Sequence, residues 1–184
     1  MNKIRVAALH ARRVLDPDSR AELSELICER VIHSRLFFAS KAIGCYLPMA
    51  DEVDTRSIIE AGWRANKRIF VPVLRKHGKM SFCEIDHGTP LICNRFGVWE
   101  PTEGALIQPR QLDIAIAPTV AFDENNNRIG MGGGYFDRCF AYLRLRRSWF
   151  RPKLIGVAFD CQKVEKISPN PWDIPLYRVF SETS

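Results

Sequence analysis

Apolar residues recur every three or four positions near the start of the chain, at Ile4, Ala8, Ala11 and Leu15. This spacing predicts an amphipathic helix, and Arg5 and Arg12, seven positions apart, share one basic face of it. The sequence Asp-Pro-Asp at 16–18 then breaks the pattern. A second apolar stripe follows at helical spacing, at Leu23, Leu26, Ile27 and Val31. The start of the chain is therefore predicted to form a helical hairpin.

Continuous apolar runs predict buried strands over residues 42–47, 69–73, 112–122 and 154–159, and a minor strand is predicted over 80–85. The run over 112–122 is the strongest of them. Because it does not alternate with polar residues, we expect this strand to be covered on both faces, at the centre of a sheet.

A helix is predicted between the first two strands, where Ile58, Ile59 and Trp63 lie at helical spacing. Asp54 can cap this helix, and Asn66 lies near its end. Strands that alternate with helices indicate a three-layer α/β/α fold with a mostly parallel central sheet. In such folds, ligands bind at the carboxyl ends of the strands.

The segment 86–111 is rich in glycine and proline, which predicts a long loop. It contains the sequence from Asn94 to Pro101, with Phe96 and Trp99. A loop of this length in a small domain fits a binding segment, and it fits a solvated excursion equally well. The composition does not decide between the two.

The densest group of glycines, Gly130, Gly132, Gly133 and Gly134, lies between a turn over 123–128 and a helix predicted from about Tyr135 to Arg146. Glycines let backbone N–H groups approach phosphate oxygens closely. A phosphate cradle and a tight turn without a ligand are both compatible with the pattern. A Walker loop needs Lys and then Ser or Thr after its last glycine, and a dinucleotide fingerprint needs glycine at the position of Tyr135. Both are excluded.

The chain has 184 residues, 46% of them hydrophobic, so we expect one domain with a continuous core over 1–184. No apolar stretch approaches the roughly 20 residues that a membrane helix needs. The basic N-terminus lacks an apolar core and serine enrichment, so a helix of the mature domain is expected there rather than a targeting segment.

Six cysteines without a C-x-x-C pair are typical of reduced thiols, which indicates a cytoplasmic protein. Cys83, His87 and Cys93 match no zinc spacing and lack a fourth ligand. The net charge of +6 and the pI near 9.1 favour an anionic ligand. Because the basic residues form no dense run, a compact anion fits better than nucleic acid.

The sequence from Gly130 to Arg138, GMGGGYFDR, resembles the signature of the 5-formyltetrahydrofolate cyclo-ligase family, also called methenyltetrahydrofolate synthetase. The resemblance extends over essentially the whole chain, through the segments 47–52, 94–101, 113–123, 159–162 and 172–175. It implies an α/β fold related to that of sugar-phosphate isomerases and CoA transferases. It also implies that the protein is an enzyme with ATP and 5-formyltetrahydrofolate as substrates, and we expect a monomer without nucleic-acid or membrane partners.

The reaction that the resemblance implies is an ATP- and Mg²⁺-dependent conversion of 5-formyltetrahydrofolate to 5,10-methenyltetrahydrofolate, with release of ADP and phosphate. The formyl oxygen takes the γ-phosphate of ATP, and N10 then closes the ring. A formamide oxygen is a poor leaving group, so ATP activates it while the protein positions the reactants and stabilises charge. No protein nucleophile is needed.

The resemblance also implies the site residues. ATP would be bound by Lys3, Arg5, Arg128, Ile129, Gly130, Met131, Gly132, Gly133, Gly134, Tyr135 and Phe136, among which Arg128 and Tyr135 are the catalytic candidates. Folate would contact Leu47, Glu52, Met131, Gly132, Gly133, Gly134 and Tyr135, with Phe96 and Trp99 as weaker stacking candidates. Asp137 and Asp173 would bind Mg²⁺, which prefers carboxylate and phosphate oxygens.

Without the resemblance, Arg5, Asp137, Asp173 and Glu52 fit ordinary surface charges. Two positions depart from the family pattern. Asn127 stands where a glycine is usual, and asparagine tolerates positive φ next best. A lysine usual before the position of Arg5 has no counterpart, which leaves Lys3 as its substitute. The rival functions are a sugar-phosphate isomerase or CoA transferase, neither of which consumes ATP, and a nucleic-acid-binding module.

Overall fold

A seven-stranded mixed sheet forms the centre of the molecule in a computed structural model that describes residues 1–75, 78–94, 97–145 and 151–184. The strands, in sheet order, are β11 (Arg178–Phe180), β10 (Lys153–Val157), β7 (Ile114–Pro118), β1 (Ala42–Gly44), β2 (Arg68–Leu74), β3 (Met80–Ile85) and β6 (Leu106–Ile107). All pairs from β11 to β2 are parallel, and β3 and β6 add an antiparallel edge. The prediction of an α/β fold with a mostly parallel sheet is confirmed.

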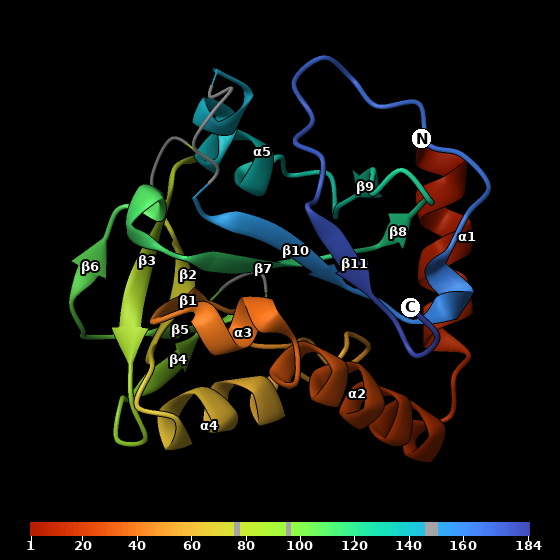
Figure 1. Ribbon diagram of the computed structural model, residues 1–184. Helices are drawn as coiled ribbons and strands as arrows, with labels where there is room; N and C mark the ends of the chain where they lie inside the picture. The colour runs from red at the N-terminus through yellow and green to blue at the C-terminus, as the bar shows by residue number, and fades with distance from the viewer. Residues whose placement is uncertain (76–77, 95–96, 146–150) are drawn as a thin grey trace.

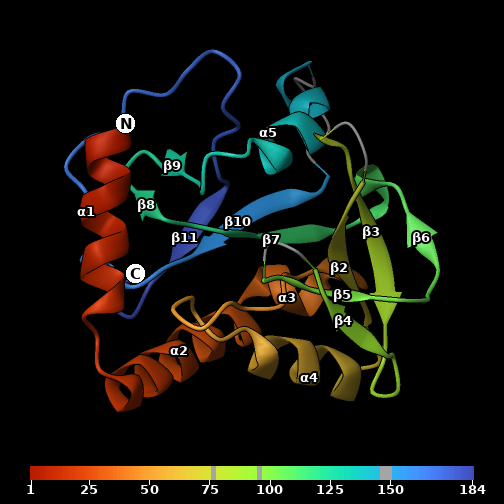
Figure 2. The same cartoon turned by 180° about the vertical axis from the view of Figure 1, so that it is seen from behind.

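Helices lie on both sides of the sheet. The helices α2 (Pro17–Ile32), α3 (Arg35–Ala39) and α4 (Arg56–Arg64) cover one face, and α5 (Tyr135–Cys139) with the 3₁₀ segment Ala141–Leu145 lies on the other (Figures 1 and 2). The helix α1 (Asn2–Arg13) stands at one end of the sheet, beside the hairpin of β8 (Ala121–Phe122) and β9 (Arg128–Ile129).

Alternate residues of the central strands enter two different hydrophobic clusters. In β7, Ile114 and Ile116 pack among the residues under α2 and α4, whereas Ala115 and Ala117 pack with Phe82 and Phe140 on the opposite face. Both faces of the strand are therefore buried, which explains the continuous apolar run and confirms its expected position inside the sheet. The strand itself is shorter than the run, because β8 leaves the sheet and pairs with β9.

Both predicted helices are present, but they do not form the predicted hairpin, because α1 packs with β8 and β9 whereas α2 packs in the cluster that α4 also joins (Figure 1). Asp16 caps α2 by accepting a 2.9 Å hydrogen bond from Ser19 N–H, and Pro17 occupies the first turn, where its missing N–H has no cost. The cap predicted for α4 is displaced by one residue. Thr55 stands at the N-cap, while Asp54 accepts a hydrogen bond from Arg56 N–H. Asn66 follows the helix with a φ of 53°, near the predicted end.

The prediction of a loop over 86–111 was wrong in part. This segment contains the antiparallel strands β4 (Leu91–Cys93) and β5 (Trp99–Pro101), and then β6. Glu100 fixes the pair to the sheet by accepting a 2.7 Å hydrogen bond from Leu74 N–H. Strands of three residues are too short to give a period, so their pattern could not be read. Phe96 lies outside the described residues.

Other boundaries also changed. The run over 42–47 forms strand only at β1, and α5 ends at Cys139 before a 3₁₀ segment, while Arg146 lies outside the described residues. The short strand β11 and the helix α3 were not predicted. In the turn after Asp123, Asn126 adopts the positive φ, 59°, that was expected of Asn127. Asn127 instead donates hydrogen bonds to Asp123 from its backbone and its side chain.

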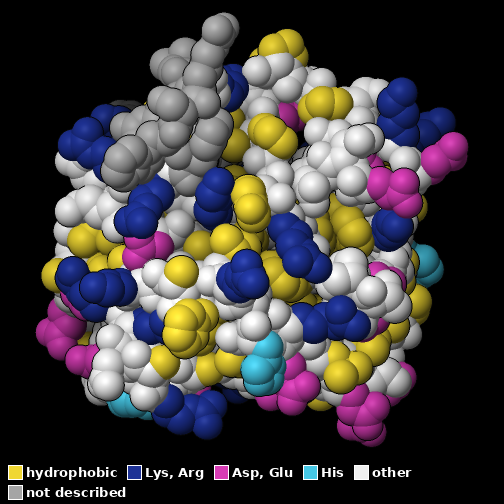
Figure 3. All heavy atoms as spheres, in the orientation of Figure 1, with side chains coloured by type: hydrophobic (Ala, Val, Ile, Leu, Met, Phe, Trp, Pro, Cys, Tyr) yellow, Lys and Arg dark blue, Asp and Glu magenta, His cyan; other side chains and the backbone are white. Residues whose placement is uncertain are grey.

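In the described part of the chain, no helix combines the length and apolar character needed to cross a bilayer. On the face seen in Figure 3, Lys and Arg side chains are interspersed with acidic and hydrophobic ones. The basic side chains therefore form no single patch on this face.

Candidate functional site

A cavity of about 530 Å³ opens where β1, β2 and β7 end. Tyr46 and Leu47 follow β1 into its wall, Leu74 ends β2 and Pro118 ends β7. The segment from β9 into α5, with Gly130 to Phe136, forms the facing wall. The cavity thus lies at the carboxyl edge of the parallel strands, where α/β folds bind ligands.

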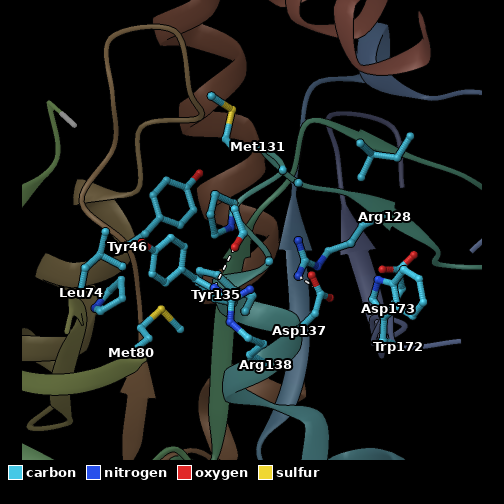
Figure 4. Close-up of a pocket in the computed structure, with 18 of the residues that line it drawn as sticks. Tyr46, Leu74, Met80, Arg128, Met131, Tyr135, Asp137, Arg138, Trp172 and Asp173 are labelled. Atoms are coloured by element: carbon cyan, nitrogen blue, oxygen red, sulfur yellow. Dashed lines mark hydrogen bonds and ion pairs between the residues drawn. The ribbon is translucent and has the colours of Figure 1, made fainter. Parts of the chain in front are cut away.

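The cavity has an apolar side and a charged side. Figure 4 shows Tyr46, Leu74 and Met80 together on one side and Arg128, Asp137 and Asp173 on the other, with Tyr135 between them. An aromatic ring system fits the first side, and a phosphorylated group with a cation fits the second. Met80 begins an antiparallel strand, so it reaches this edge from the opposite chain direction.

The glycine segment has carbonyl groups that are bound and N–H groups that are not. Gly130 O accepts a 2.9 Å hydrogen bond from Arg5 Nε, and Gly133 O accepts one of 2.8 Å from Arg138 Nη2. Gly132 and Gly134 have φ values of 100° and 62°, in the left-handed region that favours glycine. Within the described residues, the N–H groups of 130–134 have no hydrogen-bond partner. Such a row of free donors can receive phosphate oxygens.

Arg138 was missed by the sequence reasoning, although it belongs to the glycine motif itself. Its guanidinium bonds Gly133 O and also Gly78 O at 3.2 Å, and it lies 5.1 Å from the centre of the Tyr135 ring. The residue therefore joins the glycine segment to the turn between β2 and β3. In a charge pattern along the sequence, this arginine looks the same as a solvated surface arginine, so the pattern gives no signal for these contacts.

Arg128 is a buried cation beside the cavity. Its side chain is 4% exposed, its Nη2 lies 3.1 Å from Asp137 Oδ1, and its Nε has no described hydrogen-bond partner. Burial lowers the pKa of Arg128, and Asp137 and Asp173 oppose that shift. A partly satisfied guanidinium at a cavity wall can bind a phosphate oxygen at little further desolvation cost.

Asp137 and Asp173 suit a magnesium ion in their chemistry. Asp137 Oδ1 accepts from Arg128 and from Ile174 N–H, and Asp173 Oδ2 accepts from Asn170 N–H at 2.7 Å. The second oxygen of each carboxylate, Oδ2 and Oδ1 respectively, has no partner among the described residues. Two carboxylate oxygens, completed by phosphate and water, are a usual magnesium set. Among the described residues, no group of three or more His, Cys, Asp or Glu could hold a metal ion by itself.

Glu52 lines both this cavity and a second one, of about 820 Å³, which Trp99 also lines. The residue is 7% exposed, and its Oε2 accepts a 3.1 Å hydrogen bond from Met49 N–H. Burial raises the pKa of Glu52, although the Met49 hydrogen bond and Arg12 act in the opposite direction. Glu52 and the neighbouring Leu47 line both cavities.

Most of the predicted site residues come together in one place, whereas Lys3 and Trp99 do not line the first cavity. The first cavity is lined by Arg5, Leu47, Glu52, Arg128, Ile129, Gly130, Met131, Gly132, Gly133, Gly134, Tyr135, Phe136, Asp137 and Asp173. Lys3 is exposed and is not among its lining residues. Trp172, 59% exposed at the rim, was not predicted. The basic face expected for α1 is also divided, because Arg5 reaches the cavity whereas Arg12 is buried against Asp51.

Comparisons with known proteins identify the family to which the chain is similar. The model of the 5-formyltetrahydrofolate cyclo-ligase family matches residues 1–182. A 5-formyltetrahydrofolate cyclo-ligase of Escherichia coli K12 is 34% identical over 176 residues, which cover 92% of this chain and 93% of that protein. One of Haemophilus influenzae is 35% identical over 147 residues, covering 77% of this chain and 75% of its own.

A solved structure is similar over the whole chain. The NMR structure of Aquifex aeolicus 5,10-methenyltetrahydrofolate synthetase superposes with a TM-score of 0.84 at 29% identity. The match covers 100% of this chain and 90% of that one. The sheet and the helices around it are thus shared over nearly the full length of both proteins.

Proposed function

The chain belongs to the 5-formyltetrahydrofolate cyclo-ligase family, whose members are ATP-dependent ligases, and we propose that its cavity converts 5-formyltetrahydrofolate to 5,10-methenyltetrahydrofolate by phosphorylating the formyl oxygen. The observation that carries the proposal is the division of the cavity into an apolar side and a charged side, joined by the glycine segment. Two substrates of different chemistry can meet there.

We assign the triphosphate of ATP to the glycine segment and the charged side. The free N–H groups of 130–134 and the guanidinium of Arg128 are the donors available for phosphate oxygens. Arg5 supports the same segment through Gly130 O and adds positive charge at the cavity wall. Lys3 remains a candidate for ATP from the family resemblance alone.

The folate ring system is assigned to the apolar side. Leu47, Tyr46 and Met80 offer apolar surface, Tyr135 offers a ring to stack on, and Glu52 offers a carboxylate for pterin N–H donors. A carboxylate that accepts two N–H groups orients the ring as well as binding it. N5 and its formyl group would then face the charged side.

The reaction proceeds in two steps, a phosphoryl transfer and a ring closure. The formyl oxygen attacks the γ-phosphorus, the bond to the β-phosphate oxygen breaks, and ADP leaves. N10 then attacks the activated formyl carbon and loses its proton, and the C–O bond breaks to release phosphate. Arg128 and the N–H groups stabilise the negative charge that is transferred, and Tyr135 keeps the two substrates in contact.

A Mg²⁺ ion at Asp137 and Asp173 would neutralise charge on the phosphates. The two acids are held by hydrogen bonds of the protein itself: Arg128 donates to Asp137 Oδ1, and Asn170 donates to Asp173 Oδ2 from its backbone and its side chain. Both acids are therefore held at the cavity wall, with one oxygen each left available.

We also propose that residues 1–184 work as one domain. Ile27 near the start and Phe180 near the end pack in the same hydrophobic cluster, and Arg5 and Asp173 line the same cavity. Removal of either end would therefore disrupt both the core and the site.

The purified protein will produce the conjugated methenyl product from 5-formyltetrahydrofolate when MgATP is present, and will release one ADP per product. Absorbance of the product and an enzyme-coupled ADP assay measure the two quantities. Reactions without ATP, or with EDTA in place of Mg²⁺, are the controls and will give no product. Product formation without ATP, or no product under any condition, would exclude this function.

A further inference from the structure

Arg12 is a fully buried arginine behind the substrate cavity. Its side chain is 2% exposed, and it extends from α1 toward the loop that follows β1. Its Nη2 lies 3.0 Å from Asp51 Oδ2, and its Nη1 lies 3.9 Å from Glu52 Oε1. Arg12 itself does not line the cavity, whereas Glu52 does. The guanidinium thus contacts the cavity wall from the protein side.

The loop that carries Glu52 has no regular structure and is held by side chains of two helices. Arg13 of α1 bonds Asp51 at 3.2 Å, and Arg20 of α2 donates to Ala50 O at 2.8 Å. Neither of these arginines has a described ion pair with Glu52. Arg12 is therefore the cation that acts on the Glu52 carboxylate, while Arg13 and Arg20 fix the neighbouring backbone and Asp51.

A buried guanidinium is costly unless it compensates buried acids, so its position requires an explanation. We propose that Arg12 is a positioning residue for the folate substrate, which holds the Glu52 carboxylate in its orientation and in its charged form at the cavity wall. This inference rests on the proposed function, because it concerns the substrate that Glu52 is assigned to bind.

The charge of Glu52 depends on this contact. Burial raises its pKa, and Arg12 and the Met49 hydrogen bond limit that rise, while Asp51 adds to it. Among the described residues, the titratable groups that act on Glu52 are Asp51 of the same loop, Tyr46 after β1 and Arg12 of α1. Loss of Arg12 raises the pKa of Glu52 further, so less of the carboxylate is ionised at neutral pH. A protonated Glu52 offers one acceptor fewer to pterin N–H groups.

The test compares Arg12→Met with Arg13→Met, a matched change on the same helix that removes an exposed contact to Asp51. Binding of 5-formyltetrahydrofolate is measured by calorimetry from pH 5 to 9, and ATP binding is measured alongside. Arg12→Met will weaken folate binding about tenfold at pH 7 and move the acid limb of the binding curve to higher pH. ATP affinity and the Arg13→Met variant will stay within about twofold of the wild type.

A double-mutant cycle with Glu52→Gln separates positioning from general structural support. In the Glu52→Gln background, Arg12→Met will cost no further folate affinity, since no carboxylate remains to be held. Additive losses, or an acid limb that does not move, would overturn the proposal. If Arg12→Met does not fold, Arg12→Lys replaces it in the test. A compact ammonium cannot contact Asp51 and Glu52 together, so this variant will also move the acid limb of the folate-binding curve to higher pH. A wild-type protein that binds no folate would refute the proposed function, whereas an unmoved limb in an active enzyme refutes this inference alone.

Discussion

Arg128→Met will lower kcat/KM for ATP by about 10² to 10³, the usual loss when one well-placed charge-stabilising donor is removed. Arg128 has its Nη2 on Asp137 and its Nε without a described partner, at the charged side of the cavity. Methionine keeps much of the side-chain volume but neither donors nor charge. Steady-state kinetics with varied MgATP measures the effect, and KM for folate will change much less.

The change also leaves Asp137 without its ion-pair partner, so stability must be measured in parallel by thermal unfolding. Arg128→Met with Asp137→Asn will recover part of any lost stability, because no unpaired acid remains, and will recover no activity. Lys163→Met, which removes an exposed ion pair with Glu124, is the surface control and will change neither quantity noticeably. Near-normal kcat/KM in a folded Arg128→Met protein would contradict the assignment of Arg128 to ATP.

Asp173→Asn will raise the Mg²⁺ concentration for half-maximal activity by at least about tenfold, since loss of even an outer-shell partner commonly costs roughly 10- to 100-fold in metal affinity. The side chain keeps its shape, but its amide must either place the NH₂ group against the donors of Asn170 or turn it toward the ion. Activity is titrated with Mg²⁺ at fixed ATP. A titration curve that coincides with the wild type would remove Asp173 from the metal site.

Asp137→Asn will raise the Mg²⁺ requirement similarly and will also destabilise the protein. The reason is the buried guanidinium of Arg128, which loses its contact partner. Breaking a fully buried ion pair costs about 3–5 kcal/mol, and Asp173, which also acts on Arg128, reduces that cost. The two variants therefore differ in the midpoint of thermal unfolding, which only Asp137→Asn will lower by a large amount.

The parts of the fold that the sequence predicted best are those with a strong local signal. The strand β7 lies inside the sheet with both faces buried, so its apolar run is continuous. Asp16 and Pro17 mark the start of α2 through a capping side chain and a missing N–H. In each case the requirement, burial of both strand faces or satisfaction of the first helix N–H groups, acts on residues close together in the sequence. A pattern along the chain can therefore show it.

The parts that the sequence did not predict depend on contacts between distant residues. The strands β4, β5 and β11 are three residues long, and each is set by its partner strand rather than by its own period. The contacts of Arg12 with Asp51 and of Arg138 with Gly78 join residues far apart in the sequence, so only the folded chain shows them. Asn126 and Asn127 are the same residue type, so composition could not show which one takes positive φ.

For the site, the family resemblance indicated which residues to expect, and the folded chain shows how they lie relative to one another. Arg5 and Asp173 are far apart in the sequence, and they line one cavity because α1 and the segment before β11 meet near the glycine segment. The ion pair between Arg128 and Asp137 was not foreseen, since the two had been assigned to different ligands. Their contact ties the nucleotide and metal assignments together.

The central claim is that the N–H groups between β9 and α5 hold a triphosphate whose magnesium ion lies at Asp137 and Asp173. A crystal structure with Mg²⁺ and a non-hydrolysable ATP analogue tests it most directly. The account predicts phosphate oxygens within hydrogen-bond distance of the N–H groups of 130–134, and the ion in contact with both carboxylates. Phosphates bound elsewhere, with the glycine segment closed by its own side chains, would contradict it.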